Sequence, residues 1–141
     1  MIGADGGLRA LQLEVACLIP VIRVQHEPEY VLVTLTGDID FAAVTVLRDR
    51  LFASAGTGLP VVADLDGVTF IDAAGLGVLA GAARRAGLHG ARLHVVCARR
   101  QTRRLFRLTR LDRVVVLSGS VDEALQLLPV EEGSLATAVA V

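Results

Sequence analysis

Lysine is absent from this chain of 141 residues, and all 14 of its basic residues are arginine. Neither a Schiff-base lysine nor the lysine of a phosphate-binding loop is therefore available. The chain has only two cysteines, Cys17 and Cys97, which cannot form a disulfide framework. The formal net charge of −1 gives no general reason to bind nucleic acid or an anionic membrane surface.

Long apolar runs are also missing. The run at 11–22 is interrupted by Glu14, and the tail LATAVAV occupies only 135–141, whereas a membrane-spanning helix needs about 20 apolar residues. No basic segment with a cleavage site marks the first residues. We therefore expect a cytoplasmic protein that does not insert into a membrane.

Hydrophobic residues make up 53% of the chain, which suits one compact domain with a sizeable core. Strand-like and helix-like periods alternate, with strands predicted at 19–24, 30–37, 61–65, 91–98 and 114–117, and helices at 41–56, 75–86, 100–108 and 121–128. This order predicts an α/β fold with a mixed, largely parallel sheet of about five strands and about four helices. An N-terminal arm (1–17) and a C-terminal tail (130–141) are expected to flank the domain at 18–129.

Two acidic turns follow predicted strands. GDID at 37–40 ends one strand, and Asp72 follows the apolar segment that begins at Val61. Ligands of parallel sheets bind at the carboxyl ends of strands, so these turns are expected to be neighbours at such an edge. Asp72 is predicted to cap the following helix, and Asp40 either caps its own helix or contacts a partner.

One enzymatic alternative comes from VVADLDGV at 61–68, which resembles the first motif of haloacid-dehalogenase-type phosphatases. That resemblance implies Asp64 as the nucleophile, Asp66 as the acid/base and Mg²⁺ between the carboxylates. The reaction also needs a later acidic pair at a strand end, and the acids from Asp112 onward form no such pair. The favoured interpretation places Asp64 at the end of a strand and Asp66 in a turn with Gly67.

The remaining reactive side chains are scattered. His26, His89 and His94 lack the spacing of metal ligands, and His94 is expected at the surface or hydrogen-bonded in the core. Cys97 is expected to act as a small buried hydrophobe, with a Cys17–Cys97 redox switch as the alternative. We therefore predict no metal site, no cofactor and no enzymatic activity.

Three blocks of the sequence resemble, in order and spacing, the motifs of the STAS domain of bacterial anti-sigma-factor antagonists. They are LTGDID at 35–40, VVADLDGVTFIDAAGLGVL at 61–79, and LHVVCA with the apolar and basic segment RRLFRLTRLD between 93 and 112. The resemblance covers about residues 20 to 128. It implies a STAS-type fold for the domain at 18–129.

In that family, a serine directly after the aspartate is phosphorylated by a kinase that is also the anti-sigma factor. The unphosphorylated antagonist binds this GHKL-type kinase and frees the sigma factor. In this chain the corresponding position is Ala73, and its neighbour is Ala74. The resemblance thus implies an antagonist that is not switched by phosphorylation at Ala73, whether the alanines are natural or engineered.

The resemblance places the partner-binding surface at the second acidic turn and the helix after it, together with the first acidic turn. The residues are Asp38, Asp40, Asp72, Ala73, Ala74, Gly75, Leu76, Gly77 and Val78. The two glycines serve either close helix–sheet packing or close approach of a partner backbone. Leu76 and Val78 are expected to form an apolar contact with the partner.

The family resemblance leaves several roles open. The protein is a constitutive antagonist controlled by expression or redox state, a stressosome-like scaffold that binds other STAS proteins, a STAS subunit of a lipid-transport ATPase, or a diverged copy without a kinase partner.

Arginines are concentrated between 99 and 113. They are Arg99, Arg100, Arg103, Arg104, Arg107, Arg110 and Arg113. Arg99, Arg103 and Arg107 share one helical face, and the apolar residues at 105, 106 and 108 are expected to form the inner side. The stripe is a solvated face, a surface for an acidic partner or a nucleic-acid site, and the lack of interleaved aromatic residues argues against nucleic acid.

Overall fold

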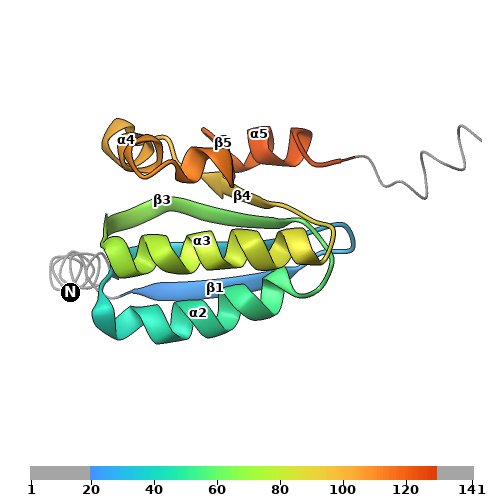
Figure 1. The fold of residues 1–141 in the computed structure, drawn as a ribbon, viewed down its shortest axis with the longest axis horizontal. Helices are drawn as coiled ribbons and strands as arrows, with labels where there is room; N and C mark the ends of the chain where they lie inside the picture. Colours follow the sequence, from blue (N-terminus) through green and yellow to red (C-terminus); the bar gives the residue numbers. More distant parts are fainter. Residues whose placement is uncertain (1–19, 130–141) are drawn as a thin grey trace, which may run out of the picture.

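The structure is a computed structural model that describes residues 20–129 (Figure 1). Its elements are β1 (Val21–His26), β2 (Val31–Ile39), α2 (Phe41–Ala55), β3 (Val61–Ile71), α3 (Ala73–Leu88), β4 (Leu93–Val96), α4 (Arg100–Leu108), the 3-10 turn η1 (Leu111–Arg113), β5 (Val116–Ser118) and α5 (Val121–Gln126). The strands lie in the order β1-β2-β3-β4-β5. β1 is antiparallel to β2 and every other pair is parallel, which confirms the predicted α/β fold.

Burial explains why the strands form. Inward residues of β2, such as Val31, Val33 and Leu35, are fully buried and alternate with partly exposed ones. All four residues of β4 are buried, as expected for an inner strand of a parallel sheet that is covered on both faces. In the described part of the chain no helix is both long and apolar enough to cross a membrane.

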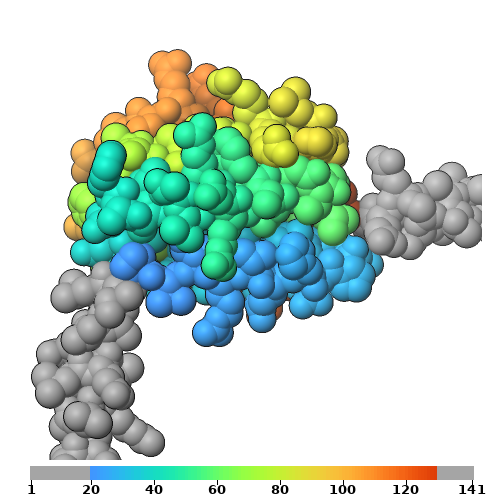
Figure 2. Space-filling model, turned by 90° about the horizontal axis from the view of Figure 1, so that it is seen from below, coloured from blue at the N-terminus to red at the C-terminus, as the bar shows by residue number. Residues whose placement is uncertain are grey.

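Helices cover both faces of the sheet. Leu47 and Leu51 of α2 and Leu79 of α3 are buried in the main core, and Figure 1 shows the two helices side by side on one face. A smaller cluster on the other face joins Val62 and Val96 to α5, where Ala124 is buried. In Figure 2 the side chains of α2, cyan to green, lie at the surface beside those of β1, in blue.

The strand β3 extends to Ile71, beyond the predicted end at 65, and its pairing with β2 contains two register shifts. Thr34 pairs with Asp64 and Thr36 with Gly67, so β3 carries one extra residue there, and a second register shift follows before Asp38. Each shift is a β-bulge, in which two residues oppose one. The predicted turn at Asp66 and Gly67 is therefore wrong, and the strand continues to Ile71.

Other boundaries also moved. The helix α3 begins at Ala73 instead of Gly75 and continues through Gly87, the predicted stop.

On α4, only Phe106 is buried, whereas Leu105 and Leu108 are 38% and 69% exposed. The prediction that all three apolar residues form its inner side is wrong. Phe106 is thus the one fully buried side chain of α4, and six of the nine helix residues are exposed.

His94 is buried in β4 with 2% of its surface exposed, and neither ring nitrogen has a hydrogen-bond partner. Its predicted place, at the surface or hydrogen-bonded in the core, is therefore wrong. Burial lowers the pKa of His94 below its usual value, and the positive charge of Arg92 lowers it further. An imidazole in such a place is held in the neutral form.

The lowered pKa of His94 predicts a loss of stability in mild acid. In the unfolded chain the histidine has a pKa near 6.5, so in mild acid the unfolded chain binds a proton that the folded chain does not bind. The free energy of unfolding is therefore constant well above pH 6.5 and decreases below pH 6.5. The free energy of unfolding should fall between pH 8 and 5.5 by up to about 1.4 kcal/mol per pH unit in the acid part. Urea titrations at several pH values measure it.

The matched variants are His94→Leu and His89→Leu, since His89 is exposed. His94→Leu should flatten the dependence on pH over this range, and His89→Leu should leave it unchanged. An unaltered pH dependence in His94→Leu would contradict the assignment.

Candidate partner-binding site

The site lies where β2 and β3 end. These parallel strands are paired up to Ile39 and Ile71, so the residues that follow, Asp40 and Asp72, lie next to each other at one edge of the sheet. The predicted proximity of the two acidic turns is confirmed. Figures 1 and 2 show the cyan start of α2 and the lime-green start of α3 at the same end of the molecule.

Both aspartates are helix caps. The Asp72 carboxylate accepts a hydrogen bond from the amide of Gly75 at 2.9 Å, and the Asp40 carboxylate accepts one from Ala43 at 3.1 Å. Each carboxylate also lies at the positive end of its helix, and a cap of this kind stabilises a helix by about 1 kcal/mol. Asp40 is exposed and Asp72 is half-buried, so the caps also present negative charge at the surface.

Ala73 and Ala74 occupy the first two positions of α3, and both are exposed. A side chain at position 73 is therefore accessible to another molecule, directly beside the Asp72 cap. Neither alanine carries a hydroxyl, so neither can accept a phosphoryl group.

The next four predicted site residues divide in two. Gly75 is buried, and a Cβ added there would lie 2.7 Å from Cγ1 of Ile71, whereas a Cβ on Gly77 would meet nothing within 4 Å. Leu76 and Val78 are only 8% and 7% exposed and pack in the main core. The apolar partner contact expected of Leu76 and Val78 is therefore not what the structure shows, because their side chains turn inward.

The two glycines should respond in opposite ways to alanine. Gly75→Ala forces the helix away from Ile71 and should lower the free energy of unfolding by about 1–3 kcal/mol. Gly77→Ala adds a better helix former in open space and should raise it by about 0.5–1 kcal/mol. Urea denaturation of both variants beside the native chain measures the difference. Equal effects would show that Gly75 does not serve helix–sheet packing.

Two exposed aromatic side chains at this edge were missed by the sequence analysis. Phe41, in the first turn of α2, is 84% exposed, and Phe70, which pairs with Asp38, is 55% exposed. The chain has only four phenylalanines. Phe70 was missed because the strand was expected to end at 65, so no position on the sheet was predicted for residue 70. Asp38 itself is half-buried and accepts a hydrogen bond from the Thr69 hydroxyl.

The carboxylates of the phosphatase-like motif bind backbone amides. Asp64 accepts a hydrogen bond from the amide of Asp66 at 3.0 Å, and Asp66 accepts one from Ala98 at 2.9 Å, which ties β3 to the loop after β4. Within 20–129 no group of three or more His, Cys, Asp and Glu side chains is arranged to hold a metal ion. The geometry therefore favours a structural role for both aspartates.

Cys97 is buried with 1% of its surface exposed, and its thiol faces the carbonyl oxygen of Arg99 at 3.7 Å. This is the place expected of a small hydrophobe. Cys17 lies outside the described residues, so the redox switch stays a prediction.

The chain matches a known family over most of its length. The profile of the STAS domain matches residues 21–124. The chain belongs to the STAS domain family. Among curated proteins, the Anti-sigma-B factor antagonist of Bacillus subtilis (strain 168) is 27% identical over 105 residues, which cover 74% of this chain and 96% of that protein.

Solved structures agree. The crystal structure of an anti-sigma factor antagonist from Mycobacterium paratuberculosis is 27% identical with a TM-score of 0.71, covering 78% of this chain and 94% of that chain. The Bacillus cell fate determinant SpoIIAA in its phosphorylated form has the same fold at 19% identity, with a TM-score of 0.61 over 75% of this chain and 97% of that chain. Both relatives at 27% identity thus bear the name of an anti-sigma-factor antagonist.

Proposed function

We propose that this STAS protein is an anti-sigma-factor antagonist that binds a GHKL-type kinase acting as the anti-sigma factor, and thereby releases the sigma factor. The proposed contact surface, named here the double-cap edge, consists of Asp38, Asp40, Phe41, Phe70, Asp72, Ala73 and Ala74. The observation that carries the proposal is the pair of adjacent, Asp-capped helix starts with an exposed residue 73 beside them. The names of the two relatives at 27% identity support the same role.

The chemistry of position 73 determines how such an antagonist is regulated. A phosphate there would add about two negative charges next to Asp72, with Asp40 on the adjacent turn. Repulsion and bulk would then separate a closely packed partner. Ala73 cannot receive that phosphate, so the antagonist stays in its binding form and is regulated by other means.

The exposed phenylalanines supply the binding energy that the buried Leu76 and Val78 cannot. Aromatic side chains are common anchors of protein interfaces because each buries a large apolar area. Phe41 stands directly after the Asp40 cap, and Phe70 pairs with Asp38 on the neighbouring strand. Exposed apolar side chains that neighbour carboxylates suit a partner surface with both apolar and basic residues.

Affinity capture from a lysate of the cells from which the chain comes tests the proposal, with captured proteins identified by mass spectrometry. The baits are the native chain, Ala73→Glu and Ala53→Glu, which adds the same charge to an exposed position near the other end of α2. A kinase-type anti-sigma factor should be held by the native chain and by Ala53→Glu, and lost from Ala73→Glu. A glutamate at the first helix position suits the helix dipole, so folding should be retained.

A second matched pair tests the aromatic anchor with the purified partner. Phe41→Ala should raise Kd at least about tenfold, whereas Leu88→Ala, which removes an equally exposed apolar side chain near the end of α3, should not change it. Capture of a lipid-transport ATPase or of other STAS proteins in place of the kinase would assign the protein to one of the other roles and overturn the antagonist proposal.

The missing phosphorylation has its own test. Incubated with the captured kinase and labelled ATP, the native chain should remain unlabelled, and Ala73→Ser should take up label at residue 73. The hydroxyl would stand at the exposed first position of α3, where only a methyl group now stands. Label on the native chain would contradict the proposal that this antagonist is not switched by phosphorylation.

A further inference from the structure

A groove of about 420 Å³ lies between the start of β1 and α2, and is named here the β1–α2 groove. The strand side of its lining consists of Pro20, Val21 and Ile22, and the helix side consists of Ala42, Ala43, Val46 and Arg50. Figure 2 shows this face of the molecule, with the dark blue start of β1 beside the cyan start of α2. Most of the lining is apolar, so the groove offers a surface that another apolar element could cover.

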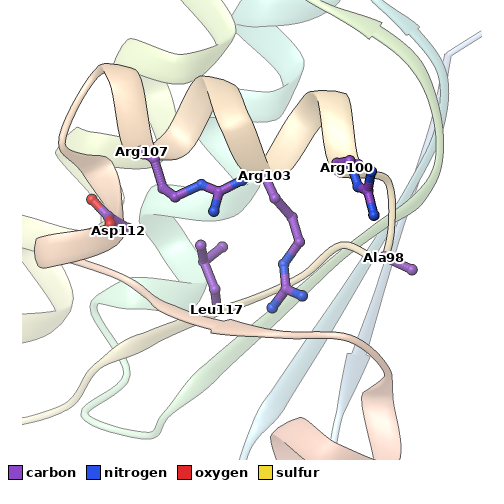
Figure 3. A pocket seen from close by; sticks show the side chains of 6 residues that line it. All are labelled: Ala98, Arg100, Arg103, Arg107, Asp112 and Leu117. Carbon is purple, nitrogen blue, oxygen red and sulfur yellow. The ribbon is translucent and has the colours of Figure 1, made fainter.

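The lining residues leave apolar surface in contact with water. Val21 and Val46 are 43% and 47% exposed. Another hollow, between α4 and β5, differs in charge because three arginines of α4 line it (Figure 3). Among the described residues that line the β1–α2 groove, Arg50 alone is charged. This groove therefore suits an apolar segment that carries a carboxylate on one side.

The residues that directly precede the groove in the sequence have a matching pattern. Leu8, Leu11, Val15 and Leu18 are spaced by three, four and three residues, so in a helix they share one face. Glu14 borders this apolar stripe. An isolated helix of this length is marginally stable in water and gains its stability by packing an apolar face. The pattern thus predicts a short helix that needs an apolar surface to pack on.

Pro20 determines how this segment reaches the groove. It is one of the lining residues, and only Ile19 separates it from Leu18. A proline disfavours the helical conformation of the residue before it, so the predicted helix ends near Leu18. A helix that folds back from there along the groove runs antiparallel to β1 and α2. Its length of about 15 Å is close to the stretch of about 12 Å over which α2 lines the groove.

We propose that residues 8–18 form an amphipathic helix that occupies the β1–α2 groove of their own chain. The apolar stripe covers Val21 and Val46, and Glu14 lies toward Arg50. The segment of the same chain is the favoured occupant because a connection this short gives it an effective concentration on the order of millimolar. A second copy of the chain has to reach that concentration in solution. The inference does not depend on the proposed antagonist role, since it concerns how the chain packs on itself.

A nitroxide label near the start of the segment tests the proposal in the full chain. Ala10→Cys places the label away from the apolar stripe, Cys17→Ala removes the competing thiol, and Cys97 is buried with 1% of its surface exposed. Amide NMR signals at 46–50 should lose most of their intensity, because docking brings residue 10 beside that part of α2. Signals at 116–118 in β5, at the opposite edge of the sheet, should keep theirs. Unchanged signals at 46–50 would overturn the proposal.

Matched substitutions in the labelled chain distinguish docking from mere proximity. Leu11→Asp interrupts the stripe and should reduce the ratio of docked to undocked chain at least about tenfold. Leu13→Asp, on the opposite side of the predicted helix, should preserve the signal loss. On α2, Val46→Asp should release the segment and Thr45→Asp should not, since both positions are exposed and only Val46 lines the groove. Equal effects within either pair would contradict docking in this groove.

A mixed sample identifies the source of the segment. Chain that carries the nitroxide but no isotope is mixed with isotope-labelled chain that carries no nitroxide. If each groove holds the segment of its own chain, the signals at 46–50 should keep their intensity in the mixture. A loss of these signals in the mixture would show that a second copy supplies the segment, and would overturn the proposal.

Discussion

The pairing of β2 with β3 determines the position of almost everything that matters at the proposed interface. These strands are parallel and stay in register up to Ile39 and Ile71, so two chain reversals occur at the same edge. Both reversals lead into helices that pack on one face of the sheet. The two helix starts are thereby fixed relative to each other by backbone hydrogen bonds and by the core beneath them. A partner at this edge would meet a surface that is already formed and would not have to order a loop, which would lower the entropy cost of binding.

Stability and recognition are divided among neighbouring residues within a single turn of α3. Asp72 caps the helix, Gly75 lets it approach Ile71, and Leu76 fills the core, while Ala73 and Gly77 face solvent. The residues that resemble the family motif therefore have different physical roles within one turn of the helix. A motif match alone does not separate those residues that a partner would contact from those that keep the contact surface in place.

The sequence predicted the fold class, the proximity of the acidic turns and the caps, because those depend on alternation and on local hydrogen-bonding chemistry. It did not predict the length of β3. Beyond Leu65 the buried residues are Val68 and Ile71, three positions apart, and a search for a period of two stops there. The exposure of Phe70 depends on the bulges of β3, and the burial of His94 depends on the helices that cover both faces of the sheet. Neither feature can be read from the local sequence pattern. Nor did the sequence show that only one apolar side chain of α4 is buried.

The bulges in β3 have a consequence for how this surface can evolve. A regular strand alternates inward and outward side chains one by one, but here two consecutive exposed residues separate each buried one: Asp66 with Gly67, then Thr69 with Phe70. Four of the six positions from Asp66 to Ile71 are exposed, whereas a regular strand exposes every second one. Mutation can therefore change the exposed side chains of the strand while the buried residues, and the fold that they specify, remain the same.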